Sequence, residues 1–218
     1  VSMFFMRGGP QQKTTDRKPV LRDLITGLNY FRATPVVFTI IGVGFGMGFF
    51  AMPYVQVMPA FAKEVLGAGA ARTGLLLMAA GIGSLLGSLF LALLGNFQHK
   101  NWLLIGAALT FPSALLLFAL SHWYWISWSI LLVVGFGVSG YTALGNGVLQ
   151  TMVPRDVLGR VTSIWSAGAA LIQIGALPMG IIADKASWPT AIGGGASMLL
   201  VVVLVMAVWR PFLRQLKV

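Results

Sequence analysis

The sequence contains no cysteine, and among its 218 residues only two are histidines and five are acidic. Without cysteine there is no disulfide framework, thiolate metal site or cysteine nucleophile. Two histidines without nearby carboxylates cannot assemble a zinc site. The chain also lacks a GxxxxGK[ST] nucleotide loop and an HExxH zinc motif. We therefore expect no metal and no cofactor.

Charge is scarce as well, because charged residues make up only 9% of the chain, whereas 57% is hydrophobic. The mean hydropathy is +0.86, far outside the range of soluble domains. A helix needs about 20 largely apolar residues to span a bilayer. Six uncharged stretches meet that length: 35–58, 74–95, 102–120, 125–153, 161–183 and 189–209. The predicted fold is an all-α integral membrane protein with six transmembrane helices.

The basic residues are distributed unevenly between the two sides of a six-span arrangement. Of 15 Lys and Arg, only Lys63, Arg72 and Lys185 fall on one side. This positive-inside pattern predicts that both termini of the segment are cytoplasmic, and it accounts for the net charge of +10 without a nucleic-acid partner. The protein is expected to be embedded in a plasma (bacterial inner) membrane. All seven tryptophans are expected near headgroup depth at span ends: Trp102, Trp123, Trp125, Trp128, Trp165, Trp188 and Trp209.

The chain divides into three parts by composition. Residues 1–34 read as the end of a preceding helix, a polar cytoplasmic linker and an interfacial amphipathic helix, in which apolar residues from Leu21 to Phe31 recur at helical spacing. Residues 35–209 form the predicted six-helix bundle, and residues 210–218 a cytoplasmic tail. Within the bundle, Pro53, Pro112 and Pro178 each remove a backbone hydrogen bond and permit a kink.

Small residues recur four apart in the first two spans, as at Gly83 and Gly87 with Ser84 and Ser88. Such faces let helix backbones approach closely in lipid. The pattern fits either static packing or surfaces that slide during a conformational change.

Three amide side chains, Gln56, Asn146 and Gln173, fall inside the predicted spans. A polar group at lipid depth costs free energy unless it is satisfied, so each either lines a cavity or forms an interhelical hydrogen bond. No carboxylate is expected at mid-membrane depth, so the chain lacks the buried acid of a proton-driven pump.

The run from Gly135 to Gly147 contains Gly137-Val138-Ser139-Gly140, the spacing in which an intramembrane serine protease presents its nucleophile. Such a serine needs a histidine on a later helix, but both histidines precede Ser139. Ser139 is therefore interpreted as a packing residue or cavity wall, and we expect neither an enzyme nor a catalytic residue.

The fourth and fifth spans carry a family resemblance. The segment "YTALGNGVLQTMVPRDVLGRVTSIWSAG" resembles the tenth helix, the next cytoplasmic loop and the eleventh helix of major facilitator superfamily exporters, in the branch of macrolide-type drug exporters and the enterobactin exporter. The shared pattern comprises Asn146, Gln150, Val153-Pro154 and Gly159-Arg160-Val161. The chain departs from it at Asn96, where the family often has Asp.

The resemblance implies that the six spans are the C-terminal half of a twelve-helix transporter, whose N-terminal six-helix half is the expected partner. Such proteins export a small molecule, typically by proton-coupled alternating access around a midplane site. On this reading the substrate is hydrophobic or amphipathic, drug- or siderophore-like. A non-transporting membrane module or scaffold is the alternative function, with an intramembrane enzyme a distant third.

The resemblance also directs attention to particular residues. The expected substrate-binding residues are Met47, Phe50, Gln56, Tyr141, Asn146 and Gln173, because aromatic, methionine and amide groups suit a largely apolar ligand. Arg155, Asp156 and Arg160 are expected in a loop that closes a cytoplasmic gate, or else as solvated topology anchors.

Overall fold

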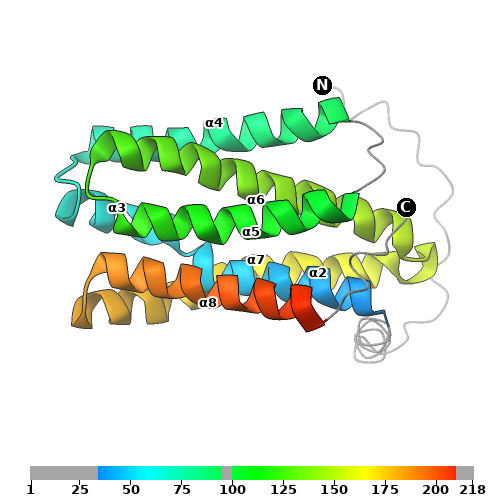
Figure 1. Cartoon of the computed structure of the whole chain (residues 1–218). Helices are drawn as coiled ribbons and strands as arrows, with labels where there is room; N and C mark the ends of the chain where they lie inside the picture. The colour runs from blue at the N-terminus through cyan, green and yellow to red at the C-terminus, as the bar shows by residue number, and fades with distance from the viewer. Residues whose placement is uncertain (1–33, 95–99, 210–218) are drawn as a thin grey trace, which may run out of the picture.

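The computed structural model describes residues 34–94 and 100–209, and this part of the chain folds as a bundle of long helices (Figure 1). These described residues contain six candidate membrane spans, which confirms the predicted all-α membrane fold. The elements are α2 (Pro35–Gly46), η2 (Met47–Ala51), α3 (Tyr54–Glu64), α4 (Ala70–Leu94), α5 (Lys100–Leu120), α6 (Tyr124–Met152), α7 (Arg155–Lys185) and α8 (Trp188–Trp209). The predicted linker and amphipathic helix (1–33), Asn96, His99 and the tail (210–218) lie outside the described residues.

Several helices are longer than the apolar stretches from which they were predicted. The first span runs to Glu64, and α7 begins at Arg155 and ends at Lys185. Hydropathy marks only the hydrocarbon depth, whereas a helix that satisfies its own backbone groups continues through the headgroup region.

The helices lie in two groups (Figure 1). In this view α4, α6 and α5 occupy the upper part of the bundle, and α2, α7 and α8 the lower part. Contacts between α5 and α8, and between α2 and α6, join the two groups. Sequence neighbours such as α6 and α7 are therefore split between the groups.

Helices α4 and α6 approach so closely that their contact requires glycine. A side chain at Gly83 would collide with the backbone carbonyl of Leu132, and one at Gly87 would lie 2.8 Å from the carbonyl oxygen of Phe136. A side chain at Gly87 would also collide with the Ser139 hydroxyl, which donates a hydrogen bond to Phe136 O at 3.2 Å. The small-residue packing predicted for this helix is confirmed, and Ser139 is part of it.

The first span is broken near its middle. Residues Met47–Ala51 form a π-helix, closed by a hydrogen bond from Met52 N to Met47 O at 2.8 Å, and α3 starts directly after Pro53. Because proline has no N–H, it cannot satisfy the carbonyl of Phe49 four residues earlier, and the helix cannot keep its regular register there. The sequence analysis expected Pro53 to permit a kink, and the structure shows this interruption at that position. Pro112 and Pro178 instead lie inside α5 and α7, which continue through them.

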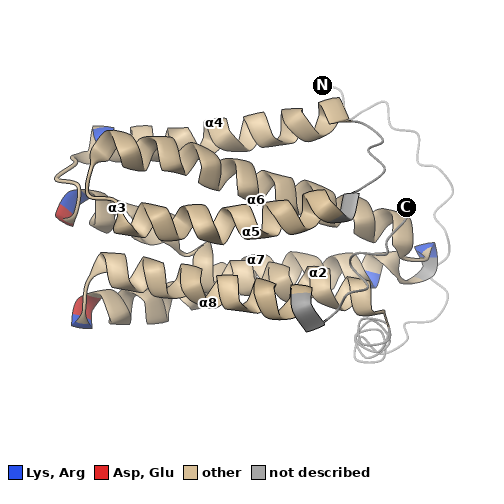
Figure 2. Cartoon of the chain, in the orientation of Figure 1, with Lys and Arg blue, Asp and Glu red and all other residues tan. Residues whose placement is uncertain are grey.

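Charged side chains gather at the two ends of the bundle (Figure 2). One end, here called the Glu64 end, carries Lys63, Glu64, Arg72, Asp184 and Lys185. The opposite end carries Arg155 and Arg160 and is called the Arg155 end. Within the described ranges no carboxylate lies between these ends, as the sequence predicted.

Candidate functional site

A cavity of about 310 Å³ lies between α2 with η2, α6 and α7. We call it the central cavity. Its lining is apolar, aromatic or hydroxyl-bearing and contains no ionisable carboxylate or amine: Gly44, Met47, Gly48, Met52, Tyr141, Thr142, Trp165, Ser166, Gly168, Ala169 and Ile172. Its volume falls at the lower end of the range of small-molecule sites, about 300–1,000 Å³.

Tyr141 joins α6 to α2 at the wall of this cavity. The side chain is almost fully buried, and its hydroxyl donates a hydrogen bond to the carbonyl oxygen of Ile40 at 2.5 Å. Its ring packs against that of Trp165, with centroids 6.2 Å apart and an interplanar angle of 36°. The hydroxyl is thus engaged within the protein, and the ring is the part that a ligand can contact.

Trp165 lines the central cavity but was not among the substrate-binding residues expected from the sequence. Because α7 begins at Arg155, Trp165 lies ten residues, or about 15 Å, from the start of the helix. Its indole fills space left by two glycines: a side chain at Gly44 would lie 2.6 Å from the Trp165 ring, and one at Gly145 would lie 3.3 Å from it. The available signal was Pro154, which marks an earlier helix start.

Gln56 and Gln173 are brought together across α3 and α7. The Gln56 Nε2 donates a hydrogen bond to the Gln173 Oε1 at 3.0 Å. Both side chains are exposed in the described structure. Each follows a cavity residue by one helical turn, Gln56 after Met52 and Gln173 after Ala169, so the pair lies just beyond the central cavity toward the Glu64 end.

The remaining predicted substrate-binding residues do not all line the central cavity. Met47 is buried and lines the central cavity. Phe50 lies three residues further along η2 and lines a different cavity, between α7 and α8. Asn146 is partly exposed on α6, next to Gly145, and is not among the central-cavity residues.

The predicted gate residues lie at the Arg155 end, away from the cavity. Arg155 is exposed at the first position of α7, and Arg160 is partly buried one turn later. Asp156 lies between them in the same helix, and its side chain is outside what the structure describes. The three residues therefore share the start of one helix.

The central cavity can bind a ligand by van der Waals contact and by hydrogen bonding. The Thr142 hydroxyl already donates to the Val138 carbonyl at 2.9 Å. Across residues 34–94 and 100–209, no group of three His, Cys, Asp or Glu side chains is placed to hold a metal ion. The aromatic and thioether lining suits an apolar ligand oriented by a few polar contacts.

Comparison with known proteins agrees with this architecture. Residues 5–216 match the family described as transmembrane secretion effector. The chain is also similar to the multidrug efflux pump Tap of Mycolicibacterium fortuitum, with 28% identity over 220 residues, covering 99% of this chain and 53% of the relative. The chain thus spans about half the length of the relative it matches. With the family match covering nearly every residue, the chain belongs to the transmembrane secretion effector family of the major facilitator superfamily.

Proposed function

We propose that this chain is the C-terminal half of a proton-coupled exporter, which moves a hydrophobic or amphipathic small molecule by alternating access. The observation that carries the proposal is the uncharged, aromatic and methionine-lined central cavity between α2, α6 and α7. The similar protein of Mycolicibacterium fortuitum is a multidrug efflux pump, which supports an export role.

The partner in this proposal is an N-terminal six-helix half. It is supported by the extent of the match, which covers only 53% of the relative. It is also supported by the absence of a mid-membrane carboxylate from the described part of this chain, because proton coupling needs an ionisable group within the membrane. That group would belong to the other half.

The proposed orientation has the Arg155 end in the cytoplasm of a bacterial inner membrane. Lys and Arg are concentrated on that side in the sequence, as the positive-inside rule requires. Arg155, Asp156 and Arg160 would then contribute to the cytoplasmic gate, while Gln56 and Gln173 lie on the exit side of the cavity.

Cavity residues are tested by substitution in the complete transporter. Tyr141→Ala should change the efflux of some substrates in a panel more than it changes protein abundance, because it removes a ring from the cavity wall. Tyr124→Ala is the matched control: it also removes a tyrosine hydrogen bond, from Tyr124 Oη to Arg72 O at 3.0 Å, but at the Glu64 end. Gln173→Leu should likewise change substrate preference.

Unchanged efflux across the panel for both Tyr141→Ala and Gln173→Leu would remove these residues from the site. Proton coupling is tested separately in everted vesicles. Collapse of the pH gradient by a protonophore should stop transport, whereas transport that persists and follows a sodium gradient would contradict a proton-driven exporter. A complete protein that transports nothing in either assay would favour a scaffold.

A further inference from the structure

The cavity that Phe50 lines is separate from the central cavity: Phe49 and Phe50 of η2 line it, whereas Met47 and Gly48 line the central cavity. It has a volume of about 250 Å³ and is entirely apolar apart from backbone groups. Phe49 and Phe50 are among its lining residues, with ring centroids 5.0 Å apart and an edge-to-face arrangement. Pro178 and Ile182 of α7 and Gly194 and Met198 of α8 form its walls. We call this cavity the lateral cleft.

The periodicity of α7 shows which way the lateral cleft opens. Thr162, Ser166 and Gln173 lie along one edge of this helix, because their spacings of four and seven residues return to nearly the same angle. Ile182 follows Gln173 by nine residues, about two and a half turns, and therefore lies on the opposite side. Ser166 lines the central cavity and Gln173 belongs to the amide pair, so Ile182 at the cleft points away from both.

The exposed residues around the mouth agree with that direction. Ile182 and Met198 are 48% and 57% exposed. Further along the same face of α8, Val201 and Val205 are also exposed and apolar. A surface that is apolar and exposed on both helices is typical of contact with lipid chains.

The position and size of the cleft fit one acyl chain. Its α8 residues run from Ala191 to Met198, and α8 begins at Trp188, so the cleft extends from about 5 to about 15 Å below that helix end. This matches the hydrocarbon of one leaflet, about half of a 30 Å core. The volume is smaller than that of typical sites for drug-sized ligands, about 300–1,000 Å³, which favours a slender occupant.

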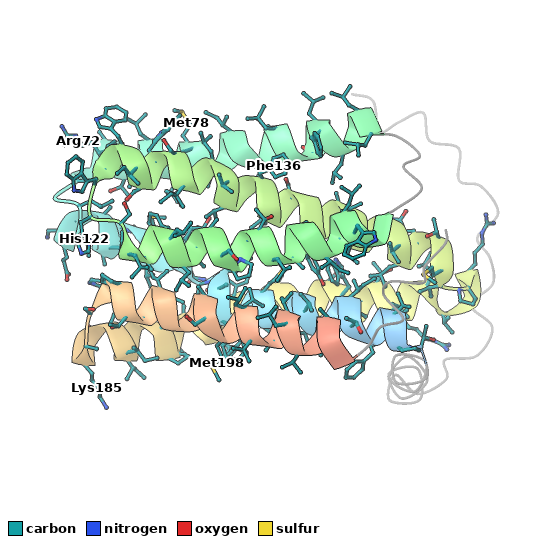
Figure 3. The ribbon with its side chains drawn as sticks, viewed as in Figure 1. Arg72, Met78, His122, Phe136, Lys185 and Met198 are labelled. Atoms are coloured by element: carbon teal, nitrogen blue, oxygen red, sulfur yellow. The ribbon has the colours of Figure 1, made fainter. Side chains whose placement is uncertain are left out.

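The cleft also ends beneath charged groups that match a lipid headgroup. Lys185, exposed at the end of α7, and Met198 both project from the lower edge of the bundle in Figure 3. The neighbouring carboxylate is Asp184, while Glu64 accepts a hydrogen bond from Trp188 Nε1 at 2.7 Å. A lysine at this depth is suited to a phosphate, and a tryptophan to the interface.

From these observations we infer that the lateral cleft binds one acyl chain of a phospholipid from the leaflet at the Glu64 end. Lipid and protein are equally apolar, so the chain is held by van der Waals contact with a surface that would otherwise leave a void. The bound chain rests on Phe49 and Phe50, whose neighbours Met47 and Gly48 line the central cavity. Lipid occupancy is thereby linked to the shape of the transport site.

The experiment uses the complete transporter in nanodiscs that contain a phosphatidylcholine with a diazirine midway along one acyl chain. After illumination, adducts are mapped by mass spectrometry. The inference expects adducts concentrated at Pro178–Ile182 and Gly194–Met198. Equal labelling of all lipid-facing positions, including Leu204 and Val205, would overturn it.

Gly194→Phe supplies a sharper test, because a side chain at Gly194 meets no atom within 4 Å and grows into the open cleft. This variant should lose most of the label at the cleft, and Gly194→Leu serves if the larger side chain prevents folding. Leu204→Phe is the control, since it adds a ring at an exposed apolar position of α8 outside the cleft. Labelling that survives in both Gly194 variants contradicts the assignment.

A competition experiment distinguishes a bound lipid from a transported molecule as the occupant of the lateral cleft. An excess of an efflux substrate should leave cleft labelling unchanged. If the substrate removes the label, the cleft takes substrate and the phospholipid assignment is wrong. A failure of the transport assays leaves this labelling result unaffected, so the two proposals fail independently.

Discussion

Replacement of Gly175 by alanine tests whether the π-helical segment is held in place by close backbone contact with α7. A methyl group at Gly175 would collide with the carbonyl oxygen of Phe49 and would lie 2.9 Å from the ring carbon Cγ of Pro53. Neither atom can rotate away, because one is backbone and the other belongs to a closed ring. The helices must therefore separate or the π-helical segment must shift.

The magnitude follows from comparison with Gly180→Ala on the same helix. A methyl group at Gly180 meets no atom within 4 Å. Both substitutions gain about 1 kcal/mol of helix propensity, so this term cancels between them. Overpacking costs about 1–3 kcal/mol, and that is the expected difference in stability. Gly175→Ala should thus be the less stable variant, while Gly180→Ala should equal or exceed the wild type.

The assay is thermal unfolding of both purified variants of the complete transporter in one detergent, followed by loss of the monodisperse peak in size-exclusion chromatography. Efflux is measured in parallel, because a shifted π-helical segment displaces Met47 and Met52 in the central cavity. If Gly175→Ala melts at or above the temperature of Gly180→Ala, the close contact between α7 and η2 does not exist in the folded protein.

Two further predictions concern single hydrogen bonds. Tyr141→Phe removes the bond to Ile40 but keeps the ring, so it should lower the free energy of unfolding by about 0.6 kcal/mol, and by at most about 1.7 kcal/mol, and retain the substrate preference. A preference changed as much as by Tyr141→Ala would show that the hydroxyl itself acts on the ligand. Trp188→Phe removes the bond to Glu64 in an exposed position and should cost no more than about 1.5 kcal/mol. The same unfolding assay checks this, and a loss clearly greater than about 1.5 kcal/mol would refute it.

The sequence predicted the transmembrane architecture because the bilayer imposes it. A span must be about 20 residues long and must satisfy its own backbone, so hydropathy and the placement of charge were enough to find six helices. Pro53 indicated that the first span could be interrupted, but it did not indicate the π-helical turn that begins at Met47. The helix ends were missed by up to two turns, since charged residues such as Arg155 and Glu64 remain helical outside the hydrocarbon.

The amino-acid sequence by itself thus determined the number of spans, the separation of charge to the two ends and the absence of a mid-membrane acid from the described helices. Only the tertiary structure decided which faces meet: it paired Gln56 with Gln173, inserted Trp165 beside Tyr141, and turned Phe50 toward the lateral cleft. The reason is physical. In a soluble protein the apolar face of a helix marks the core, but in a membrane the lipid is as apolar as the protein interior. The periodicity of apolar residues therefore does not show which face of a helix packs against the rest of the bundle. Close packing of glycines against neighbouring backbones determines which helices pack together instead.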